Sequence, residues 1–189
     1  ADPEAPNYFL LRDDFLSDQP LPGEWNIWTL AQEVDTSGTP ARIKSRYGVE
    51  LEVYLAEPAI PHWSTRQDTN HFLAHPSRPY LVDEQWVEVL TNLRAQQEPG
   101  KGFLAVLYPR KEGEPRPVFE TIAGGAGVKV STPRGTDYAF LAAEPIAWEG
   151  DGLRFEGRAG ALRHTGDHWE VVFAEAGSAF DPDTAARLE

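Results

Sequence analysis

The residues of this sequence that are best suited to chemistry lie between residues 61 and 78, in the stretch PHWSTRQDTNHFLAHPSR, which holds three of the five histidines. His71 and His75 are four residues apart, a spacing that places two side chains on the same side of a helix or of a strand. With His62 or Asp68 as a third ligand, brought near by a fold in the segment, these side chains could bind Zn²⁺. The stretch lacks the glutamate of an HExxH motif and is followed by Pro76, so a metal site is the weaker interpretation.

The same stretch also has the residue types of a carbohydrate contact. Trp63 offers a flat apolar face to the C–H groups of a sugar ring, and Arg66 and Arg78 can hold a carboxylate or a sulfate with paired donors. His71 could donate a further hydrogen bond. The alternative is an ordinary ordered loop in which Trp63 packs onto its own domain.

The charge of the chain restricts its partners. With 30 acidic and 17 basic side chains the formal net charge is -13, which argues against binding to nucleic acid or to an anionic membrane. Residues 1–40 carry eight acids against Arg12 alone, whereas residues 41–80 carry five basic and four acidic side chains. An anionic ligand is therefore best met in the second stretch. The alternative is that these charges lie on solvated strand faces and loop tips.

Several classes of site are excluded by the residues present. The chain has no cysteine, which removes zinc ribbons, redox motifs and thiol nucleophiles. No G-x-S-x-G, G-x-G-x-x-G or P-loop motif occurs, and no apolar run reaches the ~20 residues of a membrane span. We expect no cofactor.

The elements that position these residues are predicted to be strands. Residues 49–55 (VELEVYL) alternate apolar and polar side chains, as do residues 86–90, 127–131 and 153–156. Residues 103–108 (FLAVLY) are apolar throughout, which indicates a central strand covered on both faces. Trp25 and Trp28 are three apart, so on a strand they face opposite ways, one buried and one free.

Gly and Pro clusters separate these runs at about the 8–12-residue spacing of a β-sandwich. We predict one all-β domain over residues 1–189, an antiparallel, jelly-roll-like sandwich of about ten or more strands with under about a tenth of its residues helical. A short terminal helix is predicted within residues 181–189. Nine residues are predicted to form the core: Leu51, Val53, Leu104, Val106, Val128, Val130, Phe140, Phe155 and Val171.

The ends of the sequence suggest a fragment of a larger protein. It begins ADPE without an initiator methionine, and it ends in Leu188-Glu189, two residues that a cloning site can leave behind. We therefore expect the function to be that of a module.

Four stretches in order carry a family resemblance: residues 8–15 (YFLLRDDF), 24–31 (EWNIWTLA), 48–53 (GVELEV) and 103–110 (FLAVLYPR). Over residues 7–180 the chain resembles the C-terminal β-rich portion of heparinase II/III-like polysaccharide lyases. Those enzymes join a helical toroid to β-sandwich domains and cleave acidic polysaccharides by β-elimination. A base takes the C5 proton of a uronate, and a Tyr or His returns a proton to the leaving oxygen.

The resemblance implies an accessory, non-catalytic module, secreted or periplasmic, that serves as a scaffold or contacts acidic glycan. Its partners would be an acidic polysaccharide and the helical catalytic domain of the parent chain. The sequence lacks the closely spaced His/Asp stretch of the family's central sandwich, so no catalytic residue is carried over. The alternative is a free-standing small polysaccharide lyase, or a metal-dependent carbohydrate-active enzyme that uses His62, His71 and His75.

Overall fold

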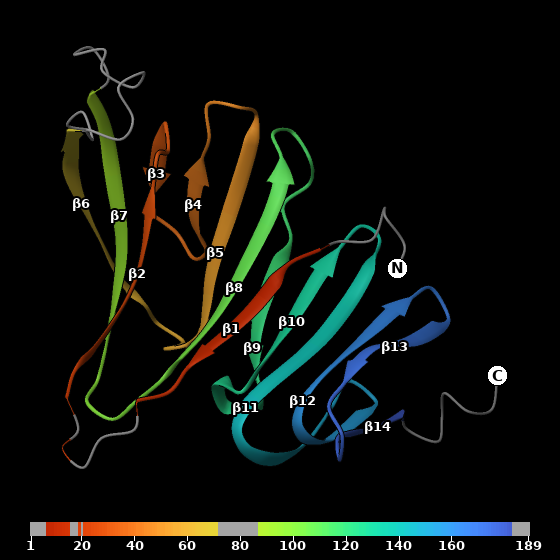
Figure 1. Ribbon diagram of the computed structural model, residues 1–189. Helices are drawn as coiled ribbons and strands as arrows, with labels where there is room; N and C mark the ends of the chain where they lie inside the picture. The colour runs from red at the N-terminus through yellow and green to blue at the C-terminus, as the bar shows by residue number, and fades with distance from the viewer. Residues whose placement is uncertain (1–6, 16–18, 20, 72–86, 183–189) are drawn as a thin grey trace, which may run out of the picture.

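The computed structural model describes residues 7–15, 19, 21–71 and 87–182, and their regular structure is almost entirely β-strand. Fourteen strands form three antiparallel sheets, which confirms the predicted all-β antiparallel fold (Figure 1). A single 3-10 turn, η2 (Ala123–Gly125), is the one helical element in the part of the chain that is described.

The three sheets have the following strands, given in spatial order. The small sheet consists of β2 (Gly23–Thr29), β7 (Val87–Gln97) and β6 (His62–His71). The middle sheet consists of β1 (Phe9–Asp13), β8 (Phe103–Lys111), β5 (Val49–Glu57), β4 (Ala41–Lys44) and β3 (Glu33–Asp35). The outer sheet consists of β13 (His168–Ala174), β12 (Leu153–Thr165), β11 (Gly135–Gly150), β10 (Gly127–Thr132) and β9 (Val118–Ile122), with β14 (Ala179–Pro182) paired to β12.

The middle sheet is covered on both faces, and β8 lies near its centre between β1 and β5. Phe103 and Ala105 of β8 pack with Trp25 and Leu93 of the small sheet. Side chains of β8 between them in sequence, such as Leu104, point the other way and pack with the outer sheet. The predicted central strand is thus confirmed: β8 is apolar at successive positions because each of its faces meets another sheet.

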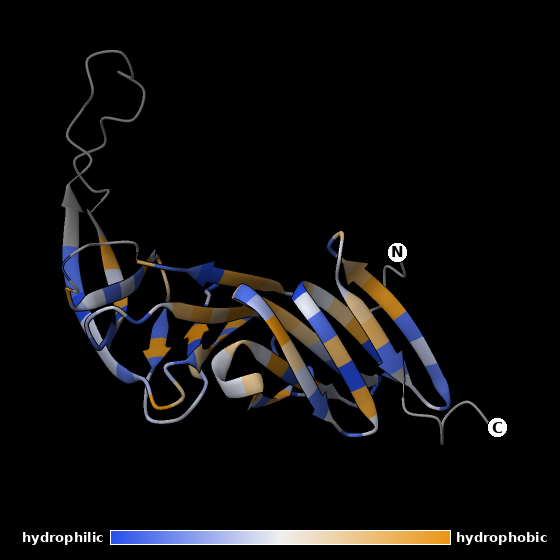
Figure 2. Ribbon diagram, turned by 90° about the horizontal axis from the view of Figure 1, so that it is seen from below, coloured by the Kyte–Doolittle hydropathy of each residue, from blue (hydrophilic) through white to orange (hydrophobic). Residues whose placement is uncertain are grey.

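Strands that are covered on one face instead alternate polar and apolar side chains, and Figure 2 shows this alternation along them. In β2, Trp25 is buried and Trp28 is 47% exposed, as their spacing predicts. Trp63 of β6 lies edge-on to Trp25, with ring centroids 6.5 Å apart. The small sheet therefore turns one apolar side toward the middle sheet, and Trp28 lies on its other side.

The outer sheet bends over its own far face. The pairing of β11 with β12 shifts register between Leu141 and Ile146, and the far parts of both strands enclose a third apolar cluster that includes Phe140, Phe155 and Leu153. Phe140 and Phe155 are stacked, with centroids 4.2 Å apart. A bent hairpin thus covers a sheet face against which the described strands place no second sheet.

The middle and outer sheets are offset from each other. β1 contacts β11, and β5 contacts β9, so the two sheets oppose each other over these strands. On one side β4 and β3 of the middle sheet extend past β9, and on the other side β12 and β13 of the outer sheet extend past β1 (Figure 1). Each sheet therefore has an overhanging part.

Rows of alternating charge run from the overhang of the middle sheet into β5 and β8. Cross-strand pairing aligns Glu33 with Lys44, Lys44 with Glu50, and Glu50 with Arg110. The neighbouring row aligns Asp35 with Arg42 and Arg42 with Glu52. Opposite charges directly across a sheet attract each other, so these rows, which we call the charge ladder, give the overhang a surface that needs no further cover.

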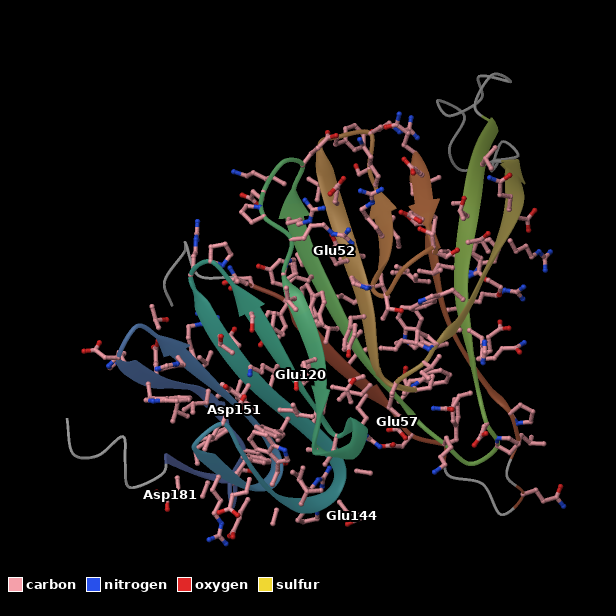
Figure 3. All side chains as sticks on the ribbon, turned by 180° about the vertical axis from the view of Figure 1, so that it is seen from behind. Glu52, Glu57, Glu120, Glu144, Asp151 and Asp181 are labelled. Carbon is pink, nitrogen blue, oxygen red and sulfur yellow. The ribbon has the colours of Figure 1, made fainter. Side chains whose placement is uncertain are left out.

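Glu52 is the most buried member of the charge ladder, with a fully inaccessible side chain, and Figure 3 labels it on the middle sheet. Arg110 donates from Nε to its Oε1 over 3.0 Å and also forms an ion pair with Glu50. Arg116, from the segment after β8, holds the same carboxylate with Nε and Nη2, each at 2.8 Å. Two guanidinium groups thus compensate one buried carboxylate.

Seven of the nine predicted core residues are buried: Val53, Leu104, Val106, Val128, Val130, Phe140 and Phe155. Leu51 is partly buried against the cluster between the small and middle sheets. Val171 was wrongly predicted, since its side chain is 55% exposed on the edge strand β13, beyond the reach of the bent hairpin. Of the predicted terminal helix, residues 181 and 182 belong instead to β14, because they pair with β12, and residues 183–189 lie outside the described part.

We predict that Leu93→Ala and Leu104→Ala will each lower the free energy of unfolding by about 2–5 kcal/mol, because each leaves a cavity in one of the two interfaces of the middle sheet. Leu21→Ala is the matched control, since Leu21 is 66% exposed. Urea denaturation measures all three. Equal losses in the buried and exposed variants would contradict the packing described.

We predict that Arg110→Met will lower the free energy of unfolding by about 3–5 kcal/mol, because it leaves the buried Glu50 without its ion pair and removes one of the two partners of Glu52. Arg66→Met removes an arginine that is 63% exposed, and it should change the stability little. If chemical denaturation finds the two variants alike, the charge ladder is not a structural element.

Candidate functional site

A cavity of about 650 Å³ opens where the overhang of the outer sheet extends past β1. We call it the edge groove, and its walls are β1 with the residues just before it on one side and β11, β12 and β13 on the other. Its volume lies in the range of sites that hold small molecules or peptide side chains. It is the candidate functional site.

One end of the edge groove carries a row of three charges. Asp137 of β11, Arg163 of β12 and Glu170 of β13 are aligned across the three strands. Arg163 holds the Asp137 carboxylate with two parallel hydrogen bonds, from Nε to Oδ1 over 2.7 Å and from Nη2 to Oδ2 over 2.8 Å. These bonds raise the pKa of Arg163, so its guanidinium stays protonated over the physiological range.

Tyr8, just before β1, completes this end of the groove. Its ring stacks on Tyr108, with centroids 6.0 Å apart, and its hydroxyl donates a hydrogen bond to Asp137. Burial raises the pKa of Tyr8 far above its ordinary value of 10.0, and the negative charge of Asp137 raises it further. Tyr8 therefore keeps its proton at neutral pH and can act as a donor but not as a general base.

The body of the edge groove is apolar. Ala139 and Ala161 lie opposite each other on β11 and β12, and these small side chains leave room above the sheet. The pairing of β12 with β13 shifts register between Ala161 and Leu162, so both Val172 and Phe173 of β13 line the cavity. Their side chains are 52% and 55% exposed. Such apolar exposure along an open groove is typical of a surface that meets another molecule.

A second cluster of ionisable groups lies on the far face of the outer sheet, where Figure 3 labels Asp151. Asp151, in the turn between β11 and β12, accepts hydrogen bonds from Lys129 over 2.5 Å and from Tyr138 over 3.0 Å. The bond with Lys129 lowers the pKa of Asp151 and raises that of Lys129, while burial raises the pKa of Tyr138. Each group is held in its neutral-pH protonation state, as expected of a bond that fastens the bent hairpin.

The residues predicted to contact carbohydrate are not brought together by β6. Trp63 packs against the core between the small and middle sheets. Arg66 is three positions further along the same strand, so its side chain lies on the opposite face, 63% exposed and 3.9 Å from Asp68. A single sugar ring cannot meet both. Arg78, the third predicted contact, lies outside the described residues.

The predicted metal ligands are also separated. His62 pairs with Gln96 at one end of β6 and His71 with Val87 at the other, nine residues away, which is roughly 30 Å along a strand. His75 lies outside the described residues. Within residues that are described, no group of three His, Asp or Glu side chains could hold a metal ion. The structure therefore gives no support to a site that shares His62 and His71.

The edge groove has no counterpart in the sequence motifs. Its polar end comes from Tyr8, Asp137, Arg163 and Glu170, which belong to four separate stretches of the chain. The local signal was slight: Asp137 and Arg163 place charges on strand faces that elsewhere carry apolar side chains. Only the pairing of β11 with β12 shows that these charges neutralise each other.

In comparisons with known proteins, no family model, no curated protein and no solved structure matches this chain. In the described part of the chain, no helix is long and apolar enough to span a membrane.

We predict that the chain loses stability as the pH rises above 10, the ordinary pKa of tyrosine, because Tyr8 ionises there in the unfolded chain but keeps its proton in the folded chain. Its contribution is fully present below that pH. Tyr8→Phe should therefore reduce the slope of unfolding free energy against pH at alkaline pH. It should not abolish the slope, since the pKa values of Tyr108 and Tyr138 are raised too.

Urea denaturation of parent and variant at a series of pH values between about 9 and 11 measures this slope. Identical slopes would show that Tyr8 is not the buried hydroxyl described.

Proposed function

We propose that this chain is an accessory, non-catalytic β-sandwich module of a polysaccharide-degrading enzyme of the heparinase II/III-like lyase type. It acts as a scaffold and works outside the cytosol, where such polysaccharides occur. The observation that carries the proposal is the position of the four stretches that resemble these lyases. Residues 8–15, 103–110 and 48–53 correspond to β1, β8 and β5, three adjacent strands of the middle sheet.

The fourth stretch, residues 24–31, contains most of β2, which packs onto that sheet through Trp25. The resemblance is thus concentrated in the residues that build the core. A likeness in core strands supports a shared scaffold, and it carries no catalytic residue with it.

The ionisable groups support a non-catalytic role. β-Elimination needs a base that is deprotonated at the working pH and an acid that can give up its proton. In both clusters the pKa shifts run the opposite way: those of Tyr8 and Tyr138 are raised, and that of Asp151 is lowered. Catalytic sites usually move such values toward the working pH.

Contact with acidic glycan remains part of the proposal in a reduced form. Among the side chains of the predicted set that the structure describes, Arg66 reaches solvent on the outer face of β6. Because Trp63 packs inward, such a contact would rest on charge alone and would weaken as salt rises. The scaffold role is therefore the main one.

We predict that the purified chain will not degrade heparin, heparan sulfate, alginate or ulvan, followed by ultraviolet absorbance of unsaturated uronates. Turnover would contradict the proposal, and variants would then show which class of enzyme the chain is. Loss of turnover in Tyr138→Phe or Tyr8→Phe, with retention in His62→Ala, would indicate a small lyase. Loss on treatment with a chelator and in His62→Ala would indicate a metal-dependent enzyme.

A further inference from the structure

The edge groove lies beside a free strand edge. β1 is the last strand of the middle sheet within the described residues, and it pairs on one side only, with β8. Its backbone groups on the other side are available to a further strand. On the face of β1 turned away from the groove, Phe9 is 63% exposed and Leu11 is 41% exposed, so apolar side chains flank this edge as well.

The offset of the sheets decides where a further strand would lie. Neighbouring strands are about 4.8 Å apart in both sheets, and β1 lies against β11. A strand added beside β1 would therefore lie against β12, the neighbour of β11, with β13 just beyond. Every second side chain of that strand would point into the edge groove, toward Ala161, Val172 and Phe173.

A second copy of this chain does not fit that position. If two copies paired through β1, the β8 of one copy would come to lie against the overhanging β13 of the other. Both faces of β8 are already covered, by the small sheet and by the outer sheet. Whichever way the second copy was turned, one of these sheets would collide with β13. Two chains of net charge -13 also repel each other.

The charges of the groove indicate the chemistry of the occupant. Asp137, Glu170 and Glu175 line it with three carboxylates, against the single guanidinium of Arg163, which Asp137 already holds. A ligand with carboxylates or sulfates would be repelled. A segment with Lys or Arg near its ends would be attracted to Glu170 and Glu175.

We propose that the edge groove binds an extended segment of a partner polypeptide. The segment adds to the free edge of β1 as a further strand of the middle sheet and places apolar side chains at alternate positions in the groove. It directs basic side chains toward Glu170 and Glu175. The mode is strand addition, in which backbone hydrogen bonds supply affinity and the pocket supplies specificity. It goes beyond the scaffold role and stands on the groove alone, whatever the parent enzyme degrades.

The test selects ligands from a displayed library of random peptides of about eight residues, within the usual length of a strand, against the whole chain. We expect the enriched peptides to carry apolar residues at alternate positions and Lys or Arg near their ends. On binding of such a peptide, amide hydrogen exchange measured by NMR should slow in β1, and the chemical shifts of Val172 and Phe173 should change. Glu170→Gln with Glu175→Gln should weaken binding several-fold, and added salt should shrink that difference.

Two valines on β13 provide a matched pair. Val172→Lys places a charge in the groove and should weaken binding by at least about tenfold, because the peptide would bury that charge. Val171 is equally exposed but lies opposite Leu162 on the far face of the outer sheet, so Val171→Lys should leave the affinity unchanged. Circular dichroism checks that both variants fold. If Val172→Lys does not fold, the exchange of β1 amides in the parent chain decides whether the peptide pairs with β1.

Four results would overturn the proposal: no enriched peptide, binding that leaves the β1 amides unchanged, equal effects of the two lysine variants, or displacement of the peptide by an oligouronate. A dimer in analytical ultracentrifugation that Val172→Lys dissociates would give the groove to a second copy instead. None of these results bears on whether the chain degrades polysaccharides, so the two proposals fail separately.

Discussion

The fold depends on a middle sheet that is buried on both faces. β5 and β8 lie next to each other in it, and their side chains alternate between two interfaces, one with the small sheet and one with the outer sheet. Val53, Leu55, Leu104 and Val106 are all fully inaccessible. At roughly 25 cal/mol per Å² of buried apolar surface, two faces stabilise such a strand about twice as well as one. The other strands are arranged around this layer.

Each overhang exposes sheet surface that the opposing sheet does not cover, and the two differ in the side chains that lie there. Where β3 and β4 extend past the outer sheet, polar side chains of alternating sign neutralise one another, and Arg116 covers the buried Glu52. Where β12 and β13 extend past β1, the exposed surface is apolar and leaves an open groove. The charged overhang, whose side chains neutralise one another, needs no partner. The apolar overhang has its charges paired only at one end, which is why it is the part of the molecule to which we assign binding.

Much of the fold could be predicted from the sequence because the relevant signals are local. The run FLAVLY indicated a strand covered on both faces, and the spacing of Trp25 and Trp28 indicated one buried and one exposed ring. The prediction that Val171 is buried failed because alternation gives the face on which a side chain lies but not the distance of the strand from the sheet edge. The site could not be predicted, since the edge groove depends on the offset between two sheets and its polar residues come from four stretches. The histidine-rich segment attracted attention through composition, but a long strand separates His62 from His71.

Native-state hydrogen exchange tests the central claim, that the doubly covered middle sheet holds the molecule together. The hydrogen-bonded amides of β5 and β8 should exchange most slowly, with an opening free energy equal to that of global unfolding and falling with it as urea is added. Amides of the edge strand β13 should exchange faster, through local opening. If the amides of β8 exchange as fast as those of β13, or without following global stability, the middle sheet is not the centre of the fold.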